Sequence, residues 1–127
     1  MKISKTLAVA AIVAGIGSVH AQSLLCPKID RIKQESAVDG DFSYGALAPN
    51  NAKWLGKTAG AIDLNTLQFT GASINSTLLA CNYRNQADVT LQLQLQVTDK
   101  VQPNSQSNWK DGECLSDKLS ACAFQTP

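Results

Sequence analysis

Histidine is nearly absent from this sequence. The 127 residues include one, His20, and none follows it. Residues 21–127 therefore offer neither a Ser–His nor a Cys–His nucleophilic pair, and no histidine ligand for zinc or copper. They contain no phosphate-cradling glycine-rich loop, and no spacing singles out a Ser–Lys pair. The sequence predicts a protein that is not an enzyme and holds no cofactor.

Long apolar runs are also missing. The run Thr6–Val19 carries no charge, but it is shorter than the roughly 20 residues that a membrane-spanning helix needs. Lys2 and Lys5 precede it, and Val19-His20-Ala21 supplies small residues at the positions that a signal peptidase inspects. We expect residues 1–21 to be a cleavable signal peptide, cut between Ala21 and Gln22. Residues 22–127 then form one exported domain, periplasmic or secreted, without a stable membrane anchor.

Lipidation at Cys26 is the alternative to free export, because this cysteine lies near the expected cut. A lipidated cysteine needs small residues just before it. Leu24 and Leu25 occupy those positions, and their bulk argues against lipidation.

Neither sign of charge dominates. The full sequence carries 11 basic and 10 acidic side chains. Removal of Lys2 and Lys5 with the signal leaves nine basic against ten acidic side chains, a net charge of −1. Binding to nucleic acids or to anionic membranes depends on clustered basic residues, and no such cluster is present. We expect no nucleic-acid partner.

The four cysteines, Cys26, Cys81, Cys114 and Cys122, are an even number in a chain expected to be exported. Disulfides form and persist in that setting. Their spacing lacks the close pairs typical of zinc sites, so we expect no metal. Three pairings are open, and we favour Cys26–Cys81 with Cys114–Cys122.

The clearest structural pattern is Val89–Thr98, VTLQLQLQVT, in which apolar and polar residues alternate without a break. This period of two is typical of a strand with one buried and one wet face. Leu78–Tyr83 also predicts a strand, and the short polar link between the two indicates an antiparallel hairpin.

Other segments predict shorter elements. Leu67–Phe69 begins a strand that Gly71 ends or bulges, and Asp41–Ala48 alternates like a strand. The segment from Ile29 to Ile32 fits either a strand or one helical turn, and Ser116–Leu119 fits a helical turn. Short strands separated by Gly, Pro and Asn turns favour a mainly β fold: a small antiparallel β-sandwich or barrel, stapled by two disulfides, with at most a short helical turn.

Two groups of residues are candidates for a binding surface. Gln92, Gln94 and Gln96 lie on one uncharged, hydrogen-bonding face, although that face is also simply the solvent side of a sheet. Trp54 and Trp109 stand beside turns that carry Gly and Lys, where an exposed Trp would suit a protein or sugar surface. For both tryptophans, packing against the core is the competing interpretation.

An acidic motif, Asp39-Gly40-Asp41, could be read as part of a calcium loop or of a glycosidase pair. The further oxygen ligands that a calcium loop needs are missing after Asp41. Asp and Gly both favour turns, so we interpret the motif as a turn.

Short motifs occur in a characteristic order along the chain: Cys26-Pro27, Trp54-Leu55-Gly56, Cys81-Asn82-Tyr83, Trp109 before Cys114, and Ser120-Ala121-Cys122-Ala123-Phe124. In this order the chain resembles small exported cysteine-containing proteins of unknown function from gammaproteobacteria. The resemblance implies an exported, disulfide-bonded domain and no activity.

The function predicted from the sequence is non-catalytic binding, with another protein as partner. The alternative is an inhibitor of an exported hydrolase, presenting the loop Pro103–Gly112. One hydrolase inhibited stoichiometrically would distinguish the second function from the first.

Overall fold

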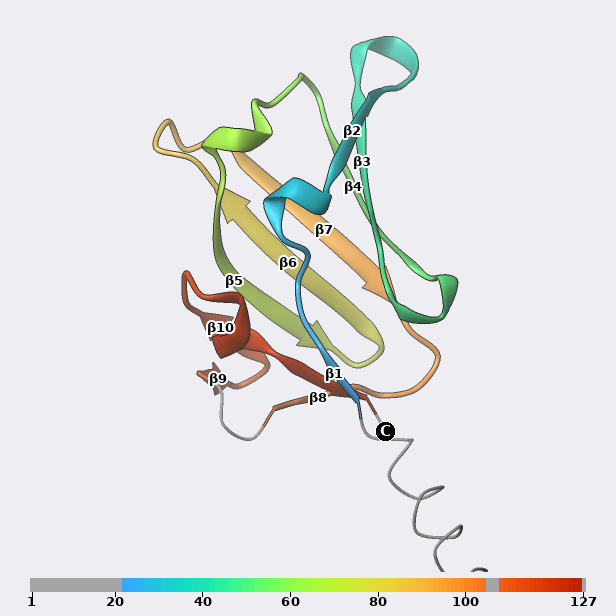
Figure 1. Cartoon of the computed structure of the whole chain (residues 1–127), viewed down its shortest axis with the longest axis vertical. Helices are drawn as coiled ribbons and strands as arrows, with labels where there is room; N and C mark the ends of the chain where they lie inside the picture. Colours follow the sequence, from blue (N-terminus) through green and yellow to red (C-terminus); the bar gives the residue numbers. More distant parts are fainter. Residues whose placement is uncertain (1–21, 105–107, 127) are drawn as a thin grey trace, which may run out of the picture.

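The structure, a computed structural model, describes residues 22–104 and 108–126, which form two antiparallel sheets (Figure 1). The expected signal peptide, residues 1–21, lies outside the described residues. In spatial order the eight-stranded sheet consists of β2 (Lys33–Ser36), β3 (Phe42–Leu47), β4 (Lys53–Thr58), β7 (Thr90–Gln96), β6 (Leu78–Arg84), β5 (Gln68–Asn75), β10 (Glu113–Leu115) and β9 (Trp109–Lys110). The three-stranded sheet consists of β1 (Gln22–Leu24), β11 (Phe124–Thr126) and β8 (Gln102–Pro103).

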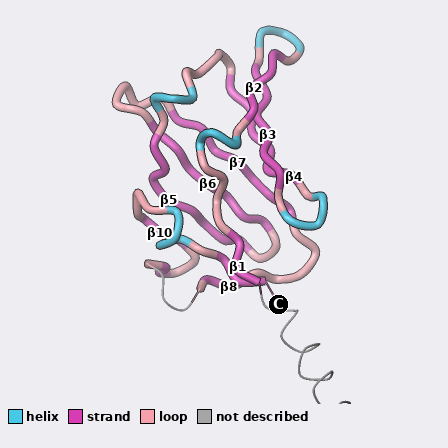
Figure 2. Tube along the Cα trace, viewed as in Figure 1, coloured by secondary structure: helices cyan, strands magenta, loops and turns pink. Residues whose placement is uncertain are grey.

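Helical structure in the described residues is limited to single 3-10 turns (Figure 2). These are η1 (Ile29–Arg31), η2 (Val38–Gly40), η3 (Pro49–Asn51), η4 (Leu64–Thr66) and η5 (Leu119–Cys122). None of them, nor any other helix in the described ranges, has the length and apolar character to cross a membrane. The mainly β fold predicted from the sequence is therefore confirmed, and its two sheets form a sandwich-like arrangement.

The predicted hairpin is β6 and β7, paired in unbroken register from Leu78–Gln96 to Arg84–Thr90. Leu91, Leu93 and Leu95 are buried, whereas the glutamines between them are exposed, as the alternation requires. The link between the strands is closed by Asn85, whose side-chain oxygen accepts hydrogen bonds from the N–H groups of Ala87 and Val89. Val89 itself precedes the strand and is exposed.

The structure also decides the predictions made for three short segments of the chain. Gly71 is a bulge within β5, which continues to Asn75. Its φ of 157° favours glycine, and any Cβ there would collide with the backbone oxygen of Cys114. The segment that begins at Ile29 forms the 3-10 turn η1. The helical turn predicted at Ser116–Leu119 is wrong.

The helical turn lies further along, at η5. The Oγ of Ser116 accepts the N–H of Lys118 and closes a non-helical turn. The first helical hydrogen bond therefore comes later, from the N–H of Ala121 to the oxygen of Lys118.

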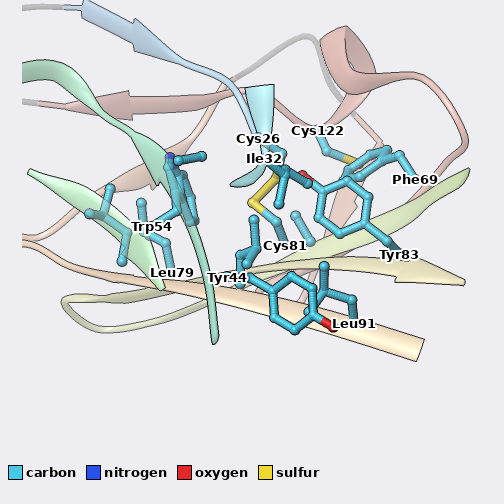
Figure 3. Packing of buried hydrophobic residues seen from close by; sticks show 14 of the residues in the cluster. Cys26, Ile32, Tyr44, Trp54, Phe69, Leu79, Cys81, Tyr83, Leu91 and Cys122 are labelled. Carbon is cyan, nitrogen blue, oxygen red and sulfur yellow. A yellow bond between two sulfur atoms is a disulfide. The ribbon is translucent and has the colours of Figure 1, made fainter. Parts of the chain in front are cut away.

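The core lies between the two sheets (Figure 3). The ring of Phe124, on the small sheet, packs against Trp54 and Trp109 at centroid distances of 6.2 and 5.3 Å. The favoured pairing of cysteines is confirmed: Cys26–Cys81 ties the segment after β1 to β6, and Cys114–Cys122 closes a local loop. The small sheet thus covers one face of the large sheet and is bonded covalently to it.

Candidate functional site

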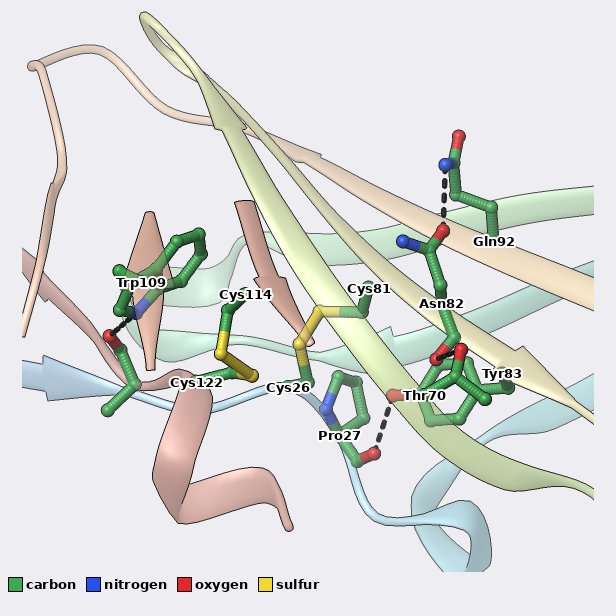
Figure 4. Close-up of a disulfide and its surroundings, with 11 residues drawn as sticks. Cys26, Pro27, Thr70, Cys81, Asn82, Tyr83, Gln92, Trp109, Cys114 and Cys122 are labelled. Carbon is green, nitrogen blue, oxygen red and sulfur yellow. Dashed lines mark hydrogen bonds between the residues drawn. A yellow bond between two sulfur atoms is a disulfide. The ribbon is translucent and has the colours of Figure 1, made fainter. Parts of the chain in front are cut away.

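The face of the eight-stranded sheet that points away from the small sheet is here called the outer face. Residues paired across antiparallel strands point to the same side, so the register defines this face strand by strand. One row crosses all eight strands: Lys33, Gly45, Leu55, Gln94, Ala80, Ser73, Glu113 and Lys110. Figure 4 shows the partly exposed Asn82 and the exposed Gln92 of this face, with the buried disulfide of the neighbouring Cys81 on the other side of β6.

The three predicted glutamines form the centre of the outer face, and their side chains are ordered by hydrogen bonds. The Nε2 of Gln94 donates to Oε1 of Gln92 at 3.1 Å, and the Nε2 of Gln92 donates to Oδ1 of Asn82 at 2.8 Å. The Nε2 of Gln96 donates to Oγ1 of Thr77 at 2.6 Å. These amides form an ordered ladder. Within the described residues Oε1 of Gln94 and Nδ2 of Asn82, at its two ends, make no hydrogen bond and are available to a ligand.

Apolar side chains flank the ladder on both sides. Leu55 on β4 and Leu47 on β3 are 59% and 80% exposed, and Leu115 on β10 is 79% exposed. The sequence had pointed to the glutamines but not to these leucines, because they come from strands far apart along the chain. The outer face therefore offers both hydrogen-bonding groups and exposed apolar side chains.

Aromatic side chains are absent from the described outer face. All those of the described residues lie on the core side or in the loops over it: Phe42, Tyr44, Trp54, Phe69, Tyr83, Trp109 and Phe124. Sugar-binding surfaces commonly stack rings against the ligand. The described outer face has no ring for that purpose.

Charge is distributed unevenly between the outer face and the rest of residues 22–127. The register places five basic side chains on the outer face, against two acidic ones, Glu35 and Glu113. The basic side chains are Lys33, Lys53, Lys57, Arg84 and Lys110. Elsewhere there are four basic and eight acidic side chains, a net charge of −4 against +3 on the outer face. The only described ion pair, Lys57 with Asp41 at 3.4 Å, lies at its margin.

Both tryptophans pack against the core. Trp54 is 1% exposed and lies in the core, so its candidacy as a surface residue is corrected. Its position in β4 alternates with the outward Lys53 and Leu55, which turns it inward. Trp109 is half-buried and its Nε1 donates to the oxygen of Ala123 at 2.9 Å. Packing against the core, the competing interpretation, holds for both.

Two other sequence features do not form a site. Asp39-Gly40-Asp41 is a turn at η2, where Asp39 has a φ of 63°. The described residues hold no group of three or more His, Cys, Asp or Glu side chains placed to bind a metal ion. Of the loop Pro103–Gly112, residues 105–107 lie outside the described residues.

The Tyr83 side chain is a buried titratable group. Desolvation raises the pKa of Tyr83 well above its ordinary value. The Tyr83 hydroxyl donates to the oxygen of Pro27 at 2.6 Å, so it joins β6 to the segment after β1 (Figure 4). The role of Tyr83 is thus structural, on the side of β6 away from the outer face.

Comparison with known protein families gives a match over most of the chain. A protein-family model described as "Protein of unknown function (DUF3757)" matches residues 19–125. No curated protein and no solved structure matches the chain. The two disulfides indicate a location outside the cytoplasm.

Proposed function

The chain belongs to the DUF3757 family of proteins of unknown function, and we propose that it is a non-catalytic binding protein whose outer face contacts an acidic protein partner. The observation that carries this proposal is the outer face itself: an ordered amide ladder, flanked by exposed leucines and surrounded by basic side chains. A face with a net charge of +3 attracts a surface of opposite charge and steers its approach.

A protein suits this face better than a sugar or a nucleic acid. The exposed Leu47, Leu55 and Leu115 need an apolar partner surface, which proteins present. A sugar partner would be expected to stack on an aromatic ring, and nucleic-acid binding to use a denser basic cluster. Peptide groups and polar side chains of a protein can in turn pair with the free amide ends at Gln94 and Asn82.

The absence of catalysis rests on the available side chains. No histidine occurs after His20, and all four cysteines are bonded in disulfides, so no thiol is left as a nucleophile. The acidic residues Asp39 and Asp41 belong to a surface turn. We therefore assign the function to surface recognition.

We further propose that the protein is exported and works in the periplasm or in the medium, after cleavage between Ala21 and Gln22. The charged, apolar and small residues of 1–21 support export, as do the disulfides. An intact mass that corresponds to a protein starting at Gln22, recovered outside the cytoplasm, is the expected result. Recovery of the uncleaved chain in the cytoplasm would contradict it.

Site-specific photo-crosslinking in the producing cells tests the binding face. A photoreactive amino acid replaces Gln94 on the outer face or, as the control, the exposed Gln125 of β11 on the small sheet. We expect Gln94 to give a covalent adduct with one protein and Gln125 to give none. Adducts from Gln125 alone would show that the protein binds by another face.

A further inference from the structure

The strand β2 forms one edge of the eight-stranded sheet and pairs only with β3. In an antiparallel ladder, hydrogen-bonded and non-hydrogen-bonded residue pairs alternate. The N–H of Ala37 donates to the oxygen of Asp41 in the same register as the β2–β3 pairs. The main-chain groups of Lys33 and Glu35 therefore face β3. Those of Gln34 and Ser36 face the open edge, where no hydrogen bond within the described residues uses them.

The side chain of Gln34 holds this edge strand in its extended conformation. The Oε1 of Gln34 accepts the hydroxyl of Tyr44 at 2.6 Å and the N–H of Ile62 at 2.8 Å, on the core side of the sheet. Because the strand is already ordered, adding another strand to it costs little conformational entropy.

The exposed charges of β2 complement those of a second copy of β2 that lies antiparallel to it. Lys33 and Glu35 flank Gln34, point to the outer face and make no ion pair within the described residues. When two copies of β2 lie antiparallel and centred on Gln34, each Lys33 stands opposite Glu35 of the second copy. Opposite charges in directly facing positions stabilise a strand pair, and like charges destabilise it.

The main-chain hydrogen-bonding groups of β2 also fit an antiparallel pairing centred on Gln34. The N–H and C=O of Gln34 exchange hydrogen bonds with those of Gln34 in the second copy. The N–H of Ser36 reaches the carbonyl of Ile32 in the second copy, which accepts no hydrogen bond within the described part of its own chain. A pairing centred on Lys33 or Glu35 also lets edge-facing main-chain groups hydrogen-bond. It is disfavoured because it places Lys33 opposite Lys33, or Glu35 opposite Glu35, and like charges in directly facing positions destabilise a strand pair.

We propose that the protein forms a symmetric dimer through antiparallel pairing of β2 with β2 of a second copy, centred on Gln34. The pairing joins the two eight-stranded sheets edge to edge. Its two-fold axis runs perpendicular to the sheet, so both outer faces point to the same side. The dimer rests on the geometry of β2 and is independent of the partner proposed for the outer face.

Sedimentation velocity and amide exchange test the dimer. The full chain is expressed from residue 1 and purified with its disulfides intact. We expect a monomer–dimer equilibrium that shifts with concentration. The amides of Gln34 and Ser36 should become protected from exchange as the dimer forms, whereas those of Lys33 and Glu35 are protected at every concentration.

Charge variants test the register. K33E and E35K each place like charges opposite one another twice, so each is expected to weaken the dimer about tenfold or more. An equimolar mixture of the two variants restores both opposite-charge pairs and should form a heterodimer. The double variant K33E/E35K should dimerise like the wild type, as should the control K53E, whose change lies two strands away from β2.

Three results would overturn the proposal. One is a wild type that stays monomeric at all concentrations, which leaves the β2 edge to an extended segment of a different protein. The second is a dimer that K33E and E35K do not weaken. The third is a mixture of the two variants that fails to form the heterodimer.

Discussion

Gly56 lies where β4 approaches β7 too closely for a side chain. A Cβ at this position would stand 2.6 Å from the backbone oxygen of Gln92 and 2.8 Å from Cδ2 of Leu93. A backbone oxygen in a sheet cannot move aside without disturbing the strand pairing. We predict that Gly56→Ala lowers the free energy of unfolding by about 1–3 kcal/mol, measured by urea denaturation.

Gly60 is the matched control for this substitution. A Cβ there would meet nothing within 4 Å, so Gly60→Ala should change the free energy of unfolding by less than about 0.5 kcal/mol. Equal losses for the two variants would mean that close packing is not the reason for glycine at position 56.

The buried hydroxyl of Tyr83 makes stability depend on pH in the alkaline range. Burial raises its pKa in the folded state above the ordinary value of about 10. The stabilisation is therefore complete below that ordinary value and is lost as the pH rises above it toward the folded pKa. We predict that the free energy of unfolding of the wild type falls between about pH 10 and pH 11.5.

Tyr83→Phe separates the two roles of this hydroxyl. The variant should lose about 1–2 kcal/mol at pH 8, because the oxygen of Pro27 loses its donor. It should also decline less steeply than the wild type above pH 10. An identical alkaline decline in both proteins would assign the effect to other groups.

The two disulfides constrain the elements to different degrees. Cys26–Cys81 spans 55 residues and Cys114–Cys122 spans 8. In the chain-entropy description the longer loop contributes about 4 kcal/mol and the shorter about 2.5 kcal/mol. The variant C26A/C81A should therefore unfold at lower urea than C114A/C122A. The reverse order would show that packing around the short loop outweighs loop entropy.

Elements with a strong periodic pattern could be predicted from the sequence. The alternation of β7 gave its strand, its buried leucines and its pairing with β6. The observed cysteine pairing is the one favoured from the sequence, which linked Cys26 to Cys81 on that hairpin but left three pairings open. By contrast β1, β8 and β9 have two or three residues each. Strands this short cannot be recognised from an alternation of apolar and polar residues.

The composition of the outer face could not be predicted, for a physical reason. Its leucines and basic residues belong to β2, β3, β4, β6, β9 and β10, and only the sheet register brings them to one side. The sequence suggested the three glutamines because they share a single strand. It also offered Trp54 as a surface residue, which the inward face of β4 buries.

At the scale of the whole molecule, the domain has a covalently fastened side and an open side. The small sheet, both disulfides and the aromatic side chains lie on one face of the large sheet. The other face carries the amide ladder and a net charge of +3, although residues 22–127 together have a net charge of −1. This separation of a stabilised side from a binding side is the central claim of the proposed function.

The affinity for the protein that crosslinks at Gln94 tests this claim most directly. The outer-face variant K53E/L55E is compared with K28E/K118E, which changes two exposed lysines away from the outer face. With unchanged urea midpoints, we predict that K53E/L55E weakens binding about tenfold or more, while K28E/K118E binds like the wild type. Wild-type affinity in K53E/L55E, or an equal loss in both variants, would contradict the assignment of binding to the outer face.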